Sequence, residues 1–186
     1  MFAAVLDANV LVPLALADTL LRTAEVGLYR PFWSLRILNE VKQAIVKVKP
    51  DVAPTRIDAR LADMRRVFPD SCVFGWEVLV DQVTSPDEND RHVVAAARLA
   101  RADVIVTRNL TDFPVDSLAR WDLEVVDPDC FLLDMLDMFK PVVLRVIREQ
   151  ASDKTRPPLA VEDVLIALGR AGVPGFARQV GSLFRS

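Results

Sequence analysis

A carboxylate follows the first apolar run of the chain. The run Ala3-Ala4-Val5-Leu6 ends on Asp7, and Asn9 comes two positions later. A short apolar run followed by polar residues is typical of a buried strand that ends in a loop. In open α/β sheets, ligands bind at that end of the central strands. Burying an ionised carboxylate is costly unless something pairs with it. Because the chain has 26 acidic and 23 basic residues, we expect a cation as the partner of Asp7.

A second acid, Glu40, lies on a predicted helix over residues 34–48. It borders an apolar stripe at helical spacing, formed by Ile37, Val41, Ala44, Ile45 and Val48. From this border its carboxylate could reach inward to a pocket. The alternative is an ordinary exposed ion pair with Arg36, four residues earlier. The pattern of this helix, taken alone, favours the ion pair over an inward-facing carboxylate.

Asp90 is a third candidate. Val93, Val94 and Ala97 follow it at helical spacing, so Asp90 is expected on the buried face of its helix. It also lies in the first turn or two, where the helix dipole favours negative charge. A structural first-turn acid and a metal ligand both remain open. The preceding Ser85-Pro86-Asp87-Glu88 is a capping-box pattern, so Asp87 and Glu88 are interpreted as capping residues.

The loop Thr107-Arg108-Asn109-Leu110-Thr111-Asp112-Phe113-Pro114 follows another apolar run. Its polar groups are therefore expected at the same edge of the sheet as Asp7. Asn109 and Asp112 could each offer an oxygen ligand, although both residue types are also common in turns.

Carboxylates that converge without a matching basic cluster repel one another unless a divalent cation neutralises them. Ligands that are all oxygen suit Mg²⁺ or Mn²⁺. One or two such ions can activate water and stabilise an in-line displacement at phosphorus, so phosphodiester hydrolysis is the natural chemistry.

The pattern of elements predicts one α/β domain over residues 1–138 and an appended helical segment over residues 139–186. Strands that alternate with helices indicate a mainly parallel central sheet with helices on both faces. The predicted strands are 2–7, 72–80, 103–107 and 124–126. The predicted helices are 10–28 (one or two), 34–48, 54–68, 86–102, 128–138, 140–151, 160–171 and 174–184. The last ~35 residues have too little core to be independent, and we expect them to pack on the main domain or on a partner.

Net charge, cysteine content and the apolar N-terminal residues bear on which ligands and locations are expected. A net charge of −3 gives no global basic field for nucleic acid. Cys72 and Cys130 are isolated and the chain has one histidine, so neither a zinc site nor a disulfide framework is expected. The apolar first 17 residues lack a basic region and are interrupted by polar residues and a proline. A signal peptide or membrane span is therefore not expected, and the predicted location is the cytoplasm.

The order of these motifs resembles the PIN domain over residues 2 to about 138, and in particular the VapC-type toxins of bacterial toxin–antitoxin pairs. The resemblance rests on VLDAN, on Glu40 in a helix, on DRHVVAAA from Asp90, and on IVTRNLTDFP. It implies a PIN-like three-layer sandwich and a Mg²⁺- or Mn²⁺-dependent endoribonuclease. By position it makes Asp7, Glu40 and Asp90 the acidic ligands.

The same resemblance assigns supporting roles. Asn9, Thr107 and Asn109 would orient ligands and water. Because Asn109 stands where many relatives carry an acid, Asp112 becomes the expected fourth carboxylate, and the choice between these two stays open. A toxin also implies an RNA substrate, a small antitoxin protein and a homodimer. The resemblance gives His92 no role, so it is interpreted as a helix-surface residue.

RNA contact needs positive charge. Residues 36–66 contain four acids against eight basic residues, namely Arg36, Lys42, Lys47, Lys49, Arg56, Arg60, Arg65 and Arg66. This local excess could hold phosphates, although a solvated helical face explains it nearly as well.

Two other functions compete with a nuclease. A non-catalytic metal-binding module, PIN-like or receiver-like, would bind a cation without cleaving RNA. A phosphatase with Asp7 as nucleophile would generally need an acid at position 9, where this chain has Asn9.

Overall fold

The computed structural model describes residues 2–83, 88–114, 118, 121–153 and 158–185. The chain forms two compact units, one of Met1–Val12 and Tyr29–Val126, the other of Pro13–Leu28 and Asp127–Ser186. Residues 13–28 thus group with the C-terminal helices and not with the strands. The sequence-based division after residue 138 stays a prediction.

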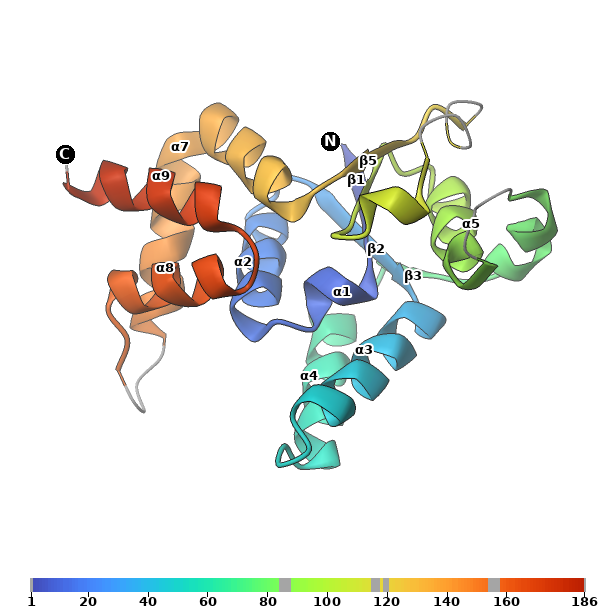
Figure 1. The fold of residues 1–186 in the computed structure, drawn as a ribbon, viewed down its shortest axis with the longest axis horizontal. Helices are drawn as coiled ribbons and strands as arrows, with labels where there is room; N and C mark the ends of the chain where they lie inside the picture. The colour runs from blue at the N-terminus through green and yellow to red at the C-terminus, as the bar shows by residue number, and fades with distance from the viewer. Residues whose placement is uncertain (1, 84–87, 115–117, 119–120, 154–157, 186) are drawn as a thin grey trace. The chain divides into compact units, whose positions relative to one another are not determined.

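The first unit is built on a parallel sheet (Figure 1). Its five strands have the order β3-β2-β1-β4-β5, and every neighbouring pair is parallel. All residues of β1 and β4 are buried. Because successive strand residues point to opposite faces, both faces of the sheet are covered. The predicted α/β fold with a parallel central sheet is confirmed. The strands are β1 (Ala3–Leu6), β2 (Arg30–Ser34), β3 (Cys72–Val73), β4 (Val104–Val106) and β5 (Glu124–Val126).

Two strand predictions differ from the structure. β2 was not predicted, because its sequence Arg30-Pro31-Phe32-Trp33-Ser34 contains a proline and does not alternate between polar and apolar residues. The predicted strand 72–80 is wrong beyond Val73. Gly75 adopts a left-handed conformation with φ 78°, which ends the strand, and a 3₁₀ helix, η1 (Trp76–Gln82), follows.

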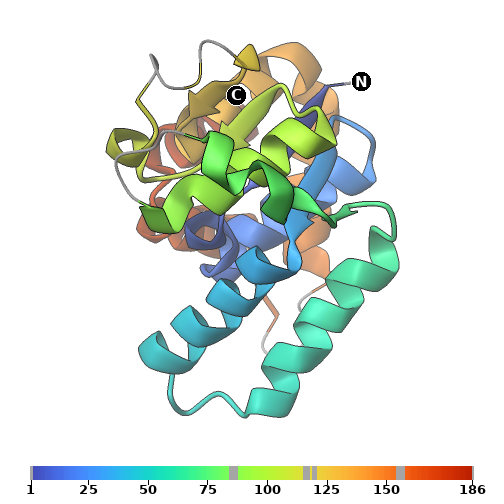
Figure 2. The same cartoon turned by 90° about the vertical axis from the view of Figure 1, so that its right-hand side faces the viewer.

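The helices described in this unit include α1 (Ala8–Leu11), α3 (Leu35–Val48), α4 (Pro54–Val67) and α5 (Arg91–Ala100). The hydroxyl of Ser34 caps α3 by accepting a hydrogen bond from the Ile37 amide at 3.1 Å, which explains why this helix begins where predicted. Pro54 opens α4, also as predicted. Figure 2 shows α3 and α4 lying side by side. Two short 3₁₀ turns also occur in this unit: η2 (Glu88–Asp90) lies directly before α5, and η3 (Leu110–Asp112) comes after β4. Of the capping box, Ser85, Pro86 and Asp87 lie outside the described residues.

The second unit is helical. It contains α2 (Leu14–Glu25), α7 (Pro128–Ser152), α8 (Val161–Arg170) and α9 (Pro174–Arg185). Phe139 interrupts α7 with non-helical φ −133°, just before Pro141, which is the break predicted between two helices. α8 and α9 pack against each other and against α7, and α2 packs on α7 and α8. A buried hydrogen bond of 2.7 Å from the Thr19 hydroxyl to Gln150 joins α2 to α7. None of the helices described is long and apolar enough to cross a membrane.

Candidate active site

Asp7 lies where β1 ends and α1 begins, and the residue is only 6% exposed. Its Oδ1 accepts a hydrogen bond from the Ala8 amide at 2.6 Å. Its Oδ2 accepts from Nδ2 of Asn9 at 2.6 Å and from the Thr107 hydroxyl at 2.7 Å. All three donors are uncharged, so they orient the carboxylate without neutralising it.

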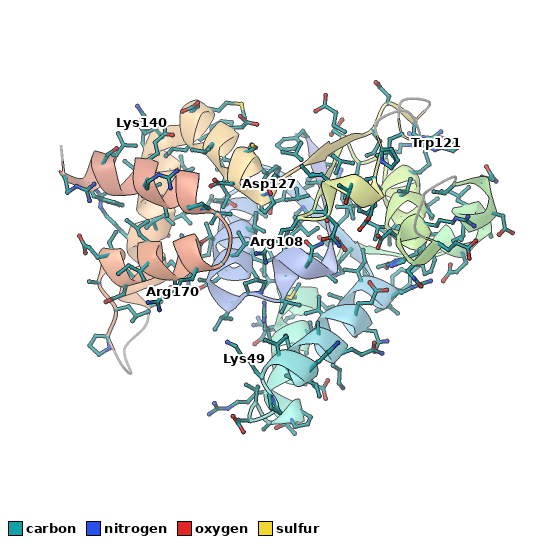
Figure 3. All side chains as sticks on the ribbon, viewed as in Figure 1. Lys49, Arg108, Trp121, Asp127, Lys140 and Arg170 are labelled. Atoms are coloured by element: carbon teal, nitrogen blue, oxygen red, sulfur yellow. The ribbon has the colours of Figure 1, made fainter. Side chains whose placement is uncertain are left out.

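Asn9 and Thr107 connect α1 to the loop after β4. Nδ2 of Asn9 also donates to the Thr107 hydroxyl at 2.8 Å, and Oδ1 of Asn9 accepts from the Arg108 amide at 3.0 Å. Thr107 in turn accepts from the backbone amide of Asn109 at 3.1 Å. Figure 3 labels Arg108 in this loop. Asn109 therefore takes part through its backbone, while its side chain is exposed.

Glu40 faces this region from α3. Its Oε1 receives two contacts, from Nε2 of His92 at 3.0 Å and from Nε of Arg36 at 3.2 Å. The ion pair with Arg36 that the helix pattern suggested is thus present. Neither contact uses Oε2, so the lone pairs of that oxygen can still accept a further contact.

The two carboxylates differ electrostatically. Burial raises the pKa of Asp7 and outweighs the lowering effect of the hydrogen bonds from Thr107 and Ala8. The charge of Glu40 raises this pKa further, and His92 lowers it. Burial would also raise the pKa of Glu40, but the contacts with His92 and Arg36 outweigh it and lower that pKa. Asp7 is therefore a buried acid whose charge remains uncompensated by its hydrogen-bond donors, and Glu40 is close enough to repel it.

His92 corrects a sequence-based expectation. It is not a helix-surface residue, because only 1% of it is exposed and its ring lies 5.7 Å from that of Trp76. Residues 92–97 of α5 are all buried, because this helix packs against several strands and against η1. The run HVVAAA contains no charged residue over more than one turn, and that was the available signal that this helix is covered on several sides.

Asp90 and Asp112 lie in short 3₁₀ turns. Asp90 is partly exposed at the end of η2, directly before α5. Arg36 reaches the preceding residue, since its Nη2 lies 3.4 Å from the Asn89 carbonyl oxygen. Asp112 is partly exposed in η3. Within the described part of the chain, no three His, Cys, Asp or Glu side chains form a group that could hold a metal ion.

Comparison with known proteins decides the family. A family model described as PIN domain matches residues 3–111, more than half of the 186 residues. The chain belongs to the PIN domain family. A model described as the VapC50 C-terminal domain matches residues 128–182.

One relative is a protein of Mycobacterium tuberculosis (strain ATCC 25618 / H37Rv) named "Putative ribonuclease VapC50". It is 40% identical over 113 residues, which are 61% of this chain and 66% of the relative. The chain thus matches slightly less than two thirds of that protein's length. No solved structure matches the chain significantly.

The residues of this PIN domain fit a divalent cation. Mg²⁺ is commonly held by one or two carboxylates, with waters and substrate phosphates filling the other positions. Asp7 and Glu40 supply two such carboxylates. Asp7 has neutral donors only and takes a single bond at Oδ1, while Oε2 of Glu40 lies outside both contacts described above. Mg²⁺ or Mn²⁺ would therefore find hard oxygen ligands with charge to neutralise.

Proposed function

We propose that this chain is a divalent-metal-dependent endoribonuclease that hydrolyses RNA phosphodiester bonds, the toxin of a VapBC-type toxin–antitoxin pair. Membership of the PIN domain family and a relative named as a ribonuclease support the class of activity. The observation that carries the proposal is the buried Asp7, whose hydrogen-bond donors are all uncharged and whose pKa is raised by burial.

In this proposal Asp7 and Glu40 hold the cation, and Asp90 and Asp112 contribute further oxygens as the substrate binds. A bound Mg²⁺ or Mn²⁺ supplies activation of water and stabilisation of negative charge on phosphorus. Thr107 and Asn9 fix the direction of the Asp7 carboxylate by donating to its Oδ2. Oδ1, with one donor, keeps capacity to bind the cation or to accept a proton from the attacking water.

The RNA backbone would be held by basic residues of α3 and α4. Four of the eight basic residues in this region are engaged elsewhere. Lys42 and Arg66 pair with Asp58 and Asp63, Arg36 with Glu40, and Arg60 binds the carbonyl oxygens of Leu11 and Val12. The remaining four are exposed and available for phosphate, namely Lys47, Lys49, Arg56 and Arg65.

RNA cleavage by the purified chain tests the proposal. We expect cleavage with Mn²⁺, none with excess EDTA, and a loss of at least ~100-fold in Asp7→Asn and Asp90→Asn. Asp134→Asn, an exposed aspartate of α7, is the matched control and should cleave at the wild-type rate. Undiminished cleavage with EDTA or in Asp7→Asn would defeat the metal-dependent mechanism.

The same assay separates the non-catalytic alternative. A regulatory module would bind Mn²⁺ in calorimetry, with affinity lost in Asp7→Asn, yet leave every RNA intact. Release of phosphate from small phosphoesters would instead indicate phosphatase chemistry.

As a toxin, the chain would act in the cytoplasm and be inhibited by a small antitoxin that places a basic side chain near the acidic residues. We also propose a homodimer. Light scattering of the purified chain would measure the oligomeric state. Co-expression with the product of a neighbouring short reading frame would test the inhibitor, through formation of a stable complex and loss of cleavage.

A further inference from the structure

The chain has one histidine, and it is buried against a proposed metal ligand. We propose that His92 is a positioning residue for the nuclease site: its Nε2–H holds Oε1 of Glu40, so that Oε2 is left to bind the cation. This inference rests on the proposed function, because it assumes that Glu40 is a ligand. Partners that hold the far side of a metal ligand commonly fix its orientation and raise its affinity.

His92 is better placed for this role than Arg36. Both lie against Oε1 of Glu40, but 42% of the Arg36 side chain is exposed, against 1% of His92. An exposed ion pair four residues apart on a helix contributes little, because water screens the charges and the side chains are mobile. A hydrogen bond from a buried ring to a carboxylate is shielded from water and held in one geometry. His92 therefore fixes Glu40 more firmly than Arg36 does.

The surroundings of the ring keep its donor directed at Glu40. Trp76 packs beside the imidazole, with ring centres 5.7 Å apart. Nδ1 is buried and has no hydrogen-bond partner among the residues described. A proton on Nδ1 would be left without an acceptor, so the favoured form carries its proton on Nε2, the atom that faces Glu40.

The contact also joins two elements of the site. Glu40 is on α3, whereas His92 is in the first turn of α5, two residues after Asp90. Arg36 adds a second link between the same regions through the carbonyl of Asn89. A bond from His92 to Glu40 therefore sets the position of one proposed ligand relative to the helix start that carries another.

Manganese affinity, measured by titration calorimetry on the tag-free chain, tests this role. We expect His92→Leu to weaken Mn²⁺ binding by ~10-fold or more, in the range reported for such outer contacts. His92→Gln, whose amide can donate from a similar position, should recover most of the affinity. Val94→Ala, a buried change two residues along α5, should lower stability but leave Mn²⁺ affinity unchanged.

A double-mutant cycle shows whether the effect passes through Glu40. In a Glu40→Gln background, His92→Leu should weaken Mn²⁺ binding no further. Wild-type affinity in His92→Leu, or an equal loss in both backgrounds, overturns the role of His92 and leaves the proposed function standing. A wild-type chain that binds no Mn²⁺ defeats the proposed function, and this role with it.

A second measurement needs no metal and covers the case in which His92→Leu does not fold. Because His92 is the only histidine of the sequence, the imidazole nitrogen signals of a ¹⁵N-labelled wild-type sample can come from no other residue. We expect a proton on Nε2, protected from exchange, and faster exchange of that proton in Glu40→Ala. A proton on Nδ1 in the wild type, or unchanged exchange in Glu40→Ala, overturns the inference.

Discussion

The hydroxyl of Thr107 donates to Oδ2 of Asp7 across 2.7 Å, although the two residues are 100 positions apart in the chain. The pairing of β1 with β4 brings them together, since Leu6 is in register with Val106 and the Asp7 amide donates to the Val106 carbonyl at 3.1 Å. The position of Thr107 against Asp7 is therefore set by the register of β1 and β4.

Thr107→Val keeps the shape of the side chain and removes its hydroxyl. The change removes one hydrogen-bond donor to Asp7. It also removes the acceptor that Thr107 offers to the side-chain amide of Asn9 and to the backbone amide of Asn109. Because Thr107 is fully buried, we expect a loss of about 1–3 kcal/mol in the free energy of unfolding, measured by urea denaturation. RNA cleavage should fall by ~10- to 100-fold.

Thr107→Ser retains the hydroxyl and is the control for this prediction. Its cleavage rate should stay within a few-fold of wild type. If Thr107→Val and Thr107→Ser behave alike, the hydroxyl does not orient Asp7.

Asp7 should make the metal-free chain less stable as pH rises. Its folded-state pKa lies above 3.8, because burial disfavours the charged form. The stabilisation from protonated Asp7 is complete below the unfolded pKa and is lost as pH rises through the folded pKa. The free energy of unfolding of wild type minus that of Asp7→Asn, measured in EDTA, should therefore decrease from pH 3.5 upward. A difference that is flat with pH would contradict this.

Glu40 should show the opposite trend. Its folded-state pKa is lowered from 4.5, with the contacts of His92 and Arg36 prevailing over burial. Its stabilisation is present above the unfolded pKa and is lost as pH falls through the folded pKa. The unfolding free energy of wild type minus that of Glu40→Gln should thus decrease on acidification, and equal slopes for the two carboxylates would disprove the assignment.

Sequence reasoning placed Asp7 and Thr107 at the same edge of the sheet because both residues follow strands. Asp7 and Thr107 each follow an apolar run, and the carboxyl ends of parallel strands meet at one edge of a sheet. The contacts among Asp7, Asn9 and Thr107 follow from that rule.

The partners of Glu40 could not be found in this way. Which side of α3 faces α5 depends on the packing of both helices on β2, a strand that the sequence pattern did not predict. His92 was interpreted as a surface residue because the resemblance gives it no role, whereas the packing of α5 against several neighbouring elements buries residues 92–97. Tertiary packing, not local pattern, decides such a contact.

In the helical unit, the carboxylate of Asp129 caps α9. It accepts hydrogen bonds from the amides of Gly175 at 2.9 Å and Phe176 at 2.7 Å. Asp129→Ala should lower the free energy of unfolding by about 0.5–2 kcal/mol. A Cβ added at Gly175 would lie 2.6 Å from Oδ2 of Asp129, so Gly175→Ala should displace the carboxylate and lose the same cap.

Because both changes remove one interaction, their effects should not add. In chemical denaturation, Gly175→Ala should cost clearly less in the Asp129→Ala background than in wild type. Additive losses would mean that the carboxylate moves aside without losing its bonds to α9.

The basic residues of α3 and α4 should govern how RNA binding depends on salt. Lys47 and Lys49 are exposed near the end of α3, where Figure 3 labels Lys49. If each contacts one phosphate, the slope of log K against log salt should fall by about 0.7 per residue replaced by Gln, because fewer counterions are released from a single strand. Fluorescence anisotropy with a short RNA in the Asp7→Asn background measures this without cleavage. Lys140→Gln, an exposed lysine of α7, should leave the slope unchanged. If Lys47→Gln and Lys49→Gln together leave it unchanged as well, the RNA backbone does not lie along this part of α3.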